Sequence, residues 1–135
     1  MLLFFELDLP FNDQLQPACL DGNLDLLMKG QSECVIVGHQ ERDGSVQISQ
    51  TPIAYQECWL EDDQHFCFKG KNKQLLTCKG DSGSPLLCRK DNSWTLVGIV
   101  TTVFERCSGD PTLLGIYNLA LKIDIIGEFI ESCIK

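Results

Sequence analysis

Short runs of β-branched and apolar residues alternate with polar turn residues along most of this chain. The runs cover residues 33–39, 45–53, 85–89, 94–104 and 113–119. Glycine, proline, aspartate and asparagine recur between them, as at Asp43-Gly44 and Gly109-Asp110-Pro111. Short strands separated by turns predict an all-β sandwich or barrel.

The C-terminal segment follows a different period. Its apolar residues are Ile123, Ile126, Phe129, Ile130, Cys133 and Ile134. Their spacing places them on one face of a helix, with Lys122, Glu128 and Glu131 off that face. The pattern therefore predicts a helix over residues 121–134 that packs on the strands, and it also allows a second, short helix at residues 54–60.

Length and charge narrow the class of protein. The 135 residues fit one domain with a core of its own. The formal net charge of −8 argues against binding to nucleic acid and to anionic membranes, since both require a cationic face. No apolar run reaches the roughly 18 residues of a membrane span.

Cysteine is the most informative residue type. The eight cysteines are Cys19, Cys34, Cys58, Cys67, Cys78, Cys88, Cys107 and Cys133. An even and dense set indicates an oxidising compartment and a disulfide framework. A zinc site is not expected, because no C-x-x-C pair is present and His39 and His65 lack ligand spacing to the cysteines.

The N-terminus does not match that compartment. The apolar run ends at Phe5 and is followed by Glu6 and Asp8, whereas a signal peptide needs about 7–15 apolar residues behind a basic region. The cysteines thus predict secretion for the parent protein, while this chain carries no signal peptide. A truncated parent reconciles the two observations.

The segment with the clearest chemistry is residues 78–86, C-K-G-D-S-G-S-P-L. It places Ser82 in a turn with Gly80 and Gly83 on either side, where the backbone N–H groups are accessible to a ligand. A hydroxyl beside converging N–H donors is what acyl transfer requires. The alternative is an ordinary loop serine in a glycine-rich turn.

This segment resembles the G-D-S-G-G-P-L motif of the trypsin/chymotrypsin-like serine protease family. Four further segments resemble family motifs in the same order: residues 11–20 (F-x-D-x-x-Q-P-x-C-L), 34–38 (C-x-x-x-G), 96–100 (L-x-G-I-V) and 114–117 (P-G-V-Y). The resemblance implies the C-terminal six-stranded Greek-key barrel of the two-barrel fold, with a C-terminal helix. Residues 1–135 would then be a partial protease domain without its first barrel.

The resemblance also implies roles for individual residues. Ser82 would be the nucleophile, and the N–H groups of Gly80 and Ser82 would form the oxyanion hole. Asp81 would pair with the new N-terminus of the activated protease. The implied disulfides are Cys34–Cys88, Cys58–Cys67 and Cys78–Cys107. Cys19 and Cys133 remain, and they either pair with each other or stay free.

The residues at the implied substrate pocket depart from the family. They are Leu76 at its floor, Thr77, Thr101, Thr102, Val103 and Gly115. Leu76 stands where a tryptic enzyme has aspartate, and Val103 replaces a glycine at the pocket mouth. Ser84 replaces the second glycine of the nucleophile motif. These changes predict no tryptic specificity, and either a preference for small residues or a parent that is drifting from catalysis.

The other catalytic residues have no counterpart in this sequence. It contains no T-A-A-H-C-like or I-V-G-G-like segment, and the resemblance places its start one or two residues after the catalytic aspartate. Asp8 matches a variable position, and neither His39 nor His65 is expected to act as general base. We therefore expect this chain to be inactive alone.

Three hypotheses remain. The chain is a fragment or short form of a secreted serine endopeptidase, a non-catalytic protease homologue that acts as a binding or regulatory module, or an acidic disulfide scaffold whose resemblance is incidental. The expected partners are a protein or peptide in the cleft and the missing N-terminal barrel. No cofactor or metal is expected.

Overall fold

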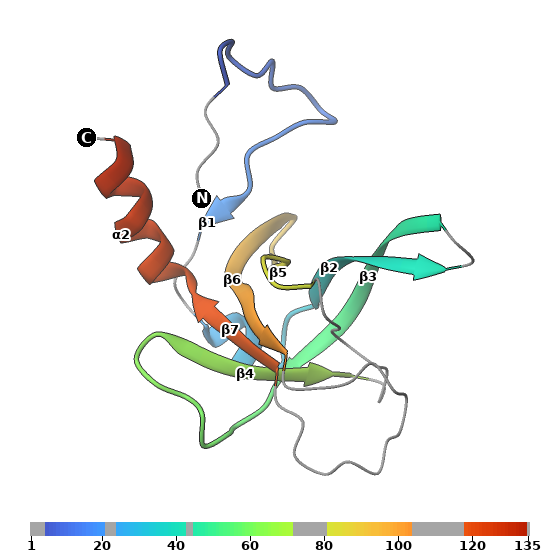
Figure 1. The fold of residues 1–135 in the computed structure, drawn as a ribbon, viewed down its shortest axis with the longest axis vertical. Coiled ribbons are helices and arrows are strands. Elements are labelled where there is room, and N and C mark those ends of the chain that lie inside the picture. The colour runs from blue at the N-terminus through green and yellow to red at the C-terminus, as the bar shows by residue number, and fades with distance from the viewer. Residues whose placement is uncertain (1–4, 21–23, 43–44, 72–80, 104–117, 135) are drawn as a thin grey trace.

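The structure is a computed structural model, and the residues that it describes are 5–20, 24–42, 45–71, 81–103 and 118–134. Its strands are β1 (Cys19–Leu20), β2 (Cys34–Arg42), β3 (Ser45–Tyr55), β4 (His65–Gly70), β5 (Pro85–Lys90), β6 (Ser93–Val103) and β7 (Asn118–Lys122). Six of these strands form the barrel in the order β6-β5-β2-β3-β4-β7, and β7 pairs back with β6 (Figure 1). Because β5 returns to lie beside β2, the connectivity is a Greek key. The predicted six-stranded barrel is confirmed.

Strand β6 closes the barrel. Its first part pairs antiparallel with β5 and its second part with β7. Register shifts at Leu86/Leu87 and Val100/Thr102 bend the strands where the sheet curves on itself. Strand β1 adds to the start of β6 in parallel, with Cys19 beside Thr95.

The core lies inside the barrel, where alternate residues of the strands point inward. Its largest fully buried side chains are Phe66, Phe68, Leu27, Ile53, Leu86, Val97 and Val100. Gly98 is required where β6 passes over this core. A Cβ at that position would lie 2.8 Å from two ring carbons of Phe66 and 3.0 Å from the carbonyl oxygen of Leu121.

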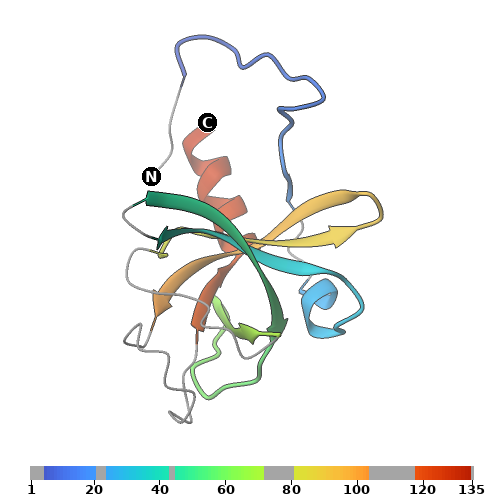
Figure 2. The ribbon, with the colours of Figure 1, turned by 90° about the vertical axis from the view of Figure 1, so that its right-hand side faces the viewer.

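Two helices flank the barrel. Helix α1 (Asp25–Met28) buries Leu27 in the hydrophobic core. Helix α2 (Ile123–Ile134) follows β7 directly and buries Ile123. Figure 2 shows α2 rising from the end of β7 on the same side as the N-terminal segment. The predicted helix begins two residues later than residue 121, because Leu121 and Lys122 still pair in the sheet. Neither helix in the described part of the chain has the length and apolar content needed to cross a bilayer.

The short helix allowed at residues 54–60 is wrong. Ala54 and Tyr55 belong to β3, where they pair with Lys69 and Phe68 of β4. Strand pairing satisfies their backbone groups, and tertiary pairing outweighs the weak local preference. Strand β4, strand β1 and helix α1 were not predicted. Of the strand predicted at residues 113–119, only the last two residues are described, and both belong to β7.

Candidate active site

Ser82 lies in a tight turn that leads into β5. The N–H of Ser84 donates to the carbonyl oxygen of Asp81 at 3.0 Å, so residues 81–84 form a hydrogen-bonded turn. Gly83, at its third position, has φ of +95°, a conformation that side-chain-bearing residues rarely adopt. Glycine at position 83 is therefore a backbone requirement, and the turn leaves the Ser82 side chain exposed.

Strand β6 holds this turn in place. The N–H of Gly83 donates to the carbonyl oxygen of Val100 at 2.8 Å, and the N–H of Val100 donates to the carbonyl oxygen of Ser84 at 3.0 Å. The Ser82 hydroxyl donates to the carbonyl oxygen of Thr101 at 3.2 Å. The turn and the strand thus bring together Ser82 and Thr101, two residues that sequence reasoning placed in the site. Thr102 and Val103 continue β6 in sequence.

Asp81 faces the backbone of β2 at a position without a side chain. A Cβ on Gly38 would lie 3.2 Å from Asp81 Oδ1 and 3.7 Å from Ser84 Oγ. The glycine of the C-x-x-x-G strand therefore leaves room for the half-buried Asp81 beside it. This close approach explains why glycine suits the last position of the C-x-x-x-G segment.

Several predicted site residues lie outside the described part of the chain. They are Gly80, Leu76, Thr77, Gly115 and the implied bridge Cys78–Cys107. The histidines are described only in part. His39 belongs to β2, opposite Ile48. The ring of His65 interacts with Asp62, its Nδ1 lying 2.9 Å from Asp62 Oδ1. The described ring of His65 therefore contacts Asp62 rather than Ser82.

Two disulfides implied by the family resemblance are present. Cys34–Cys88 joins β2 to β5 at directly paired positions and fixes the strand that follows the Ser82 turn. Cys58–Cys67 closes the loop before β4. Cys19 is exposed and free, and so does not pair with Cys133.

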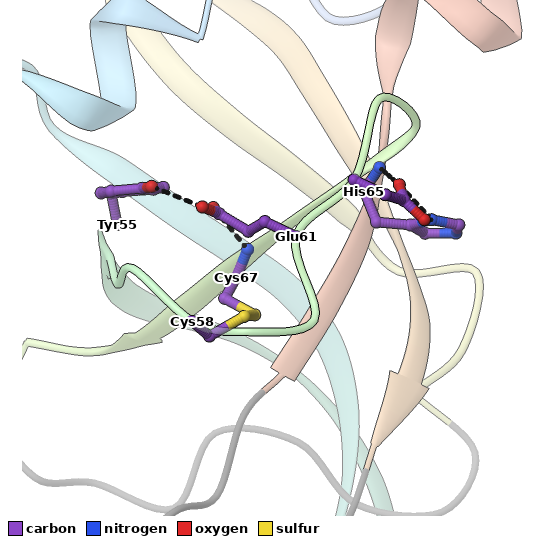
Figure 3. Close-up of a disulfide and its surroundings, with 6 residues drawn as sticks. Tyr55, Cys58, Glu61, His65 and Cys67 are labelled. Atoms are coloured by element: carbon purple, nitrogen blue, oxygen red, sulfur yellow. Dashed lines mark hydrogen bonds and ion pairs between the residues drawn. A yellow bond between two sulfur atoms is a disulfide. The ribbon is translucent and has the colours of Figure 1, made fainter.

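The loop closed by Cys58–Cys67 contains a polar network that sequence reasoning missed (Figure 3). The Tyr55 hydroxyl donates to Glu61 Oε2 at 2.8 Å, and the N–H of Cys67 donates to Glu61 Oε1 at 3.4 Å. The hydrogen bond to Glu61, together with burial, raises the pKa of Tyr55 to about 12. Tyr55 ends β3 and Glu61 lies six residues later in the loop, so no continuous helix or strand pattern links the two residues. Only the predicted disulfide across the loop could have pointed to it.

Asp62 organises the same loop from the other side. Its Oδ1 accepts the N–H groups of Gln64 and His65 at 2.8 and 2.7 Å. The hydrogen bond from Gln64 and the interaction with the His65 ring hold the pKa of the Asp62 carboxyl below its usual value. This exposed carboxylate thus has a structural role in the turn that begins β4.

No group of three or more metal-ligating side chains gathers anywhere in residues 5–20, 24–42, 45–71, 81–103 and 118–134. Within the described residues, the Ser82 turn presents a hydroxyl and backbone N–H groups. Such a set suits covalent acyl transfer once a base accepts the hydroxyl proton.

Comparison with known proteins agrees with these motifs. The model of the family described as Trypsin matches residues 1–123. Human "Serine protease 41" is 44% identical over 56 residues, which cover 42% of this chain and 17% of that protein. "CLIP domain-containing serine protease B4" of Anopheles gambiae is 34% identical over 84 residues, covering 62% of this chain and 23% of the relative. "Ovochymase" of Halocynthia roretzi is 24% identical over 124 residues, covering 82% of this chain and 8% of the relative. The chain thus spans less than a quarter of the length of each of these relatives.

Proposed function

The chain belongs to the trypsin family, and we propose that it supplies the nucleophile of a secreted serine endopeptidase, with Ser82 attacking the scissile peptide carbonyl. The observation that carries this proposal is the turn at residues 81–84. It exposes the Ser82 hydroxyl beside the end of β6, within the motif that the family uses for its nucleophile. The two disulfides support a secreted parent, since such bridges persist in oxidising compartments.

The backbone at Ser82 is suited to an oxyanion hole. The N–H of Ser82 makes no hydrogen bond within the described residues, so it is available to a substrate oxygen. The N–H of Gly80 would be the second donor, as the family motif implies. Two such donors stabilise the negative charge that develops on the carbonyl oxygen during attack.

The general base would come from outside these 135 residues. The Ser82 hydroxyl donates a hydrogen bond to the backbone carbonyl oxygen of Thr101. A carbonyl oxygen is too weak a base to remove the hydroxyl proton. We propose that a first barrel brings the histidine and aspartate, and that its histidine replaces Thr101 as the acceptor. Without them the 135-residue chain should be inactive, because losing triad members typically costs about 10⁴ to 10⁶ in rate.

The proposed substrate is a protein with a small residue before the scissile bond. Leu76, which the family resemblance assigns to the pocket floor, would offer no charge to a lysine or arginine side chain. Val103, where the family commonly has glycine, would narrow the pocket mouth. Both changes oppose tryptic cleavage.

A fluorophosphonate probe tests the assignment on the full-length natural protein. The wild type should be labelled at Ser82, as located by peptide mapping, and Ser82→Ala should abolish labelling. Ser84→Ala is the matched control two residues away, and it should retain labelling. Labelling that survives Ser82→Ala would contradict the proposal.

The second candidate function is a non-catalytic homologue that binds a protein or peptide through the same cleft. The observation that favours it is the hydrogen bond from the Ser82 hydroxyl to the carbonyl oxygen of Thr101. Val103, which the family resemblance assigns to the pocket mouth, agrees with this alternative. Absence of labelling in the full-length protein, with retained binding of a peptide, would support this alternative over the first.

A further inference from the structure

The hairpin of β2 and β3 projects from the barrel (Figure 1). Its two strands pair with each other along residues 35–42 and 45–52. Strand β4 pairs with the other side of β3 only at residues 53–55. Among the described strands, residues 46–50 of β3 thus have no neighbour on the side away from β2, and this stretch is the β3 edge.

The backbone hydrogen bond from the N–H of Lys71 to the carbonyl oxygen of Pro52, at 3.0 Å, shows which groups point to the β3 edge. Lys71 follows β4, so Pro52 directs its carbonyl away from β2. Residues two apart in a strand direct their backbone groups to the same side, and the pairing with β2 is continuous. Val46, Ile48 and Gln50 therefore direct their N–H and C=O groups outward. Within the described residues, no strand or loop bonds to these groups, which makes the edge a template for another strand.

The side chains along the β3 edge are apolar or neutral. Val46 is 68% exposed and Ile48 is 74% exposed. Natural sheets protect a free edge with charged residues or proline, and residues 45–51, S-V-Q-I-S-Q-T, contain neither. An uncharged run with β-branched residues is typical of strands that pair with another chain.

We propose that the β3 edge pairs with the same edge of a second copy of this chain, antiparallel and around a two-fold axis. Centring the pair on Ile48 puts Ile48 opposite its counterpart, and Val46 of one copy opposite Gln50 of the other. In that register all the outward N–H and C=O groups of these three residues bond across the axis. Pro52, which has no N–H, lies outside the paired region.

The charge distribution selects this occupant. Each copy carries a net charge of −8, yet the paired strands bring no like charges opposite each other, because the run is uncharged. A basic or acidic peptide would find no opposite charge along the edge. The contact falls below the roughly 1,200 Å² at which stable interfaces begin, so we expect a reversible dimer. None of these residues belongs to the Ser82 turn, and the inference therefore does not depend on the proposed catalysis.

Sedimentation equilibrium of the 135-residue chain, with its disulfides formed, tests the proposal. The wild type should show a monomer–dimer equilibrium. Ile48→Pro removes an outward N–H without taking a hydrogen bond from β2, so circular dichroism should stay unchanged while the dimer dissociation constant rises at least about 10-fold. A wild type that stays monomeric at millimolar concentration, or a folded Ile48→Pro variant with wild-type affinity, would overturn the inference.

Two lysine substitutions separate the β3 edge from the other exposed apolar surface. Ile48→Lys puts two ammonium groups opposite each other across the axis, and should weaken the dimer at least about 10-fold. Leu7→Lys is the matched control at an 83% exposed position of the N-terminal segment. It should change the dissociation constant less than about 2-fold, because a distant surface charge is screened. A larger effect of Leu7→Lys than of Ile48→Lys would place the association in the N-terminal segment and overturn the proposal.

Cysteine substitutions test the register. Residues that exchange hydrogen bonds across an antiparallel pair have Cα atoms about 5.5 Å apart, a separation that a disulfide spans. Ile48→Cys should therefore form a covalent dimer under mild oxidation. Val46→Cys places its two thiols at opposite ends of the paired region, more than roughly 13 Å apart, and should give only the background of the free Cys19. Equal cross-linking of the two variants would contradict the proposed pairing.

Discussion

The barrel and the N-terminal segment, residues 5–20, use the same apolar residue types with opposite results. In the barrel, Phe66 and Phe68 are at most 1% exposed. In the N-terminal segment, Phe5 is 65% exposed, Leu7 83% and Phe11 62%. Figure 1 shows this segment, in dark blue, extending away from the strands. Apolar residues at positions 5, 7, 9 and 11 follow the period of a strand, yet no face of the barrel receives them.

Closure explains the difference. Each barrel strand pairs on both sides, so the inward faces bury one another. The N-terminal segment has only a local turn, where Asn12 and Leu15 exchange backbone hydrogen bonds, and its short pairing at β1. A contiguous exposed apolar surface marks a contact site, and the proposed first barrel is the partner that we expect there.

Paired phenylalanine truncations should give the largest contrast between the two regions. Phe68→Ala removes a fully buried ring and should lower the free energy of unfolding by about 3–5 kcal/mol. Phe11→Ala removes an exposed ring and should change it by less than about 0.5 kcal/mol. Urea denaturation followed by circular dichroism measures both. A comparable loss in the two variants would mean that the segment packs on the barrel in solution.

The disulfides should contribute to barrel stability according to the loop that each closes. Replacing Cys34 and Cys88 together by alanine should cost about 2–4 kcal/mol. Replacing Cys58 and Cys67 together should cost about 1.5 kcal/mol less, because that bridge closes a much shorter loop in the unfolded chain. Urea midpoints of the two double variants provide the comparison. An equal or reversed order would mean that packing around the sulfur atoms outweighs chain entropy.

The fold was largely predictable because most of its elements have a local sequence pattern that identifies them. Strands β2, β3, β5 and β6 and helix α2 each carry a clear period or an ordered family motif. Strand β4 was missed because Phe66, Cys67 and Phe68 are all buried, which removes the alternation that marks a half-exposed strand. The error at residues 54–60 arose because the pairing of Ala54 and Tyr55 with β4 is invisible in the local sequence.

The site was less predictable than the fold. The motif identified Ser82 as a candidate nucleophile, and the register of β6 explains why Thr101 lies beside it. That the Ser82 hydroxyl donates to the Thr101 carbonyl could not be foreseen, because the contact joins residues 19 positions apart through a backbone atom. The Tyr55–Glu61 hydrogen bond depends on loop geometry in the same way.

A pair of glycine substitutions tests how tightly the barrel is packed compared with its surroundings. Gly98→Ala places a methyl group against the Phe66 ring and the Leu121 carbonyl, and should lower the free energy of unfolding by about 1–3 kcal/mol. Gly127→Ala lies in α2 with no atom near the new methyl group. It should raise stability by about 0.5–1 kcal/mol, because alanine favours the helix. Thermal denaturation should therefore shift in opposite directions, and a loss at both sites would contradict this packing.

The smallest expected effect concerns the loop beside the barrel. The pKa of Tyr55 is raised from 10.0 to about 12, so its contribution to stability is complete below pH 10 and is lost as pH rises toward 12. Over that window Tyr55 ionises in the unfolded chain at a lower pH than in the folded chain, so the free energy of unfolding falls as pH rises. Tyr55→Phe should cost about 1 kcal/mol near neutral pH and remove this alkaline dependence. Glu61→Gln should return the Tyr55 pKa toward 10, because the negative acceptor is gone. Ultraviolet titration of tyrosinate in the three proteins tests this. An unshifted pKa of Tyr55 in the wild type would mean that the hydrogen bond does not hold the loop to the barrel in solution.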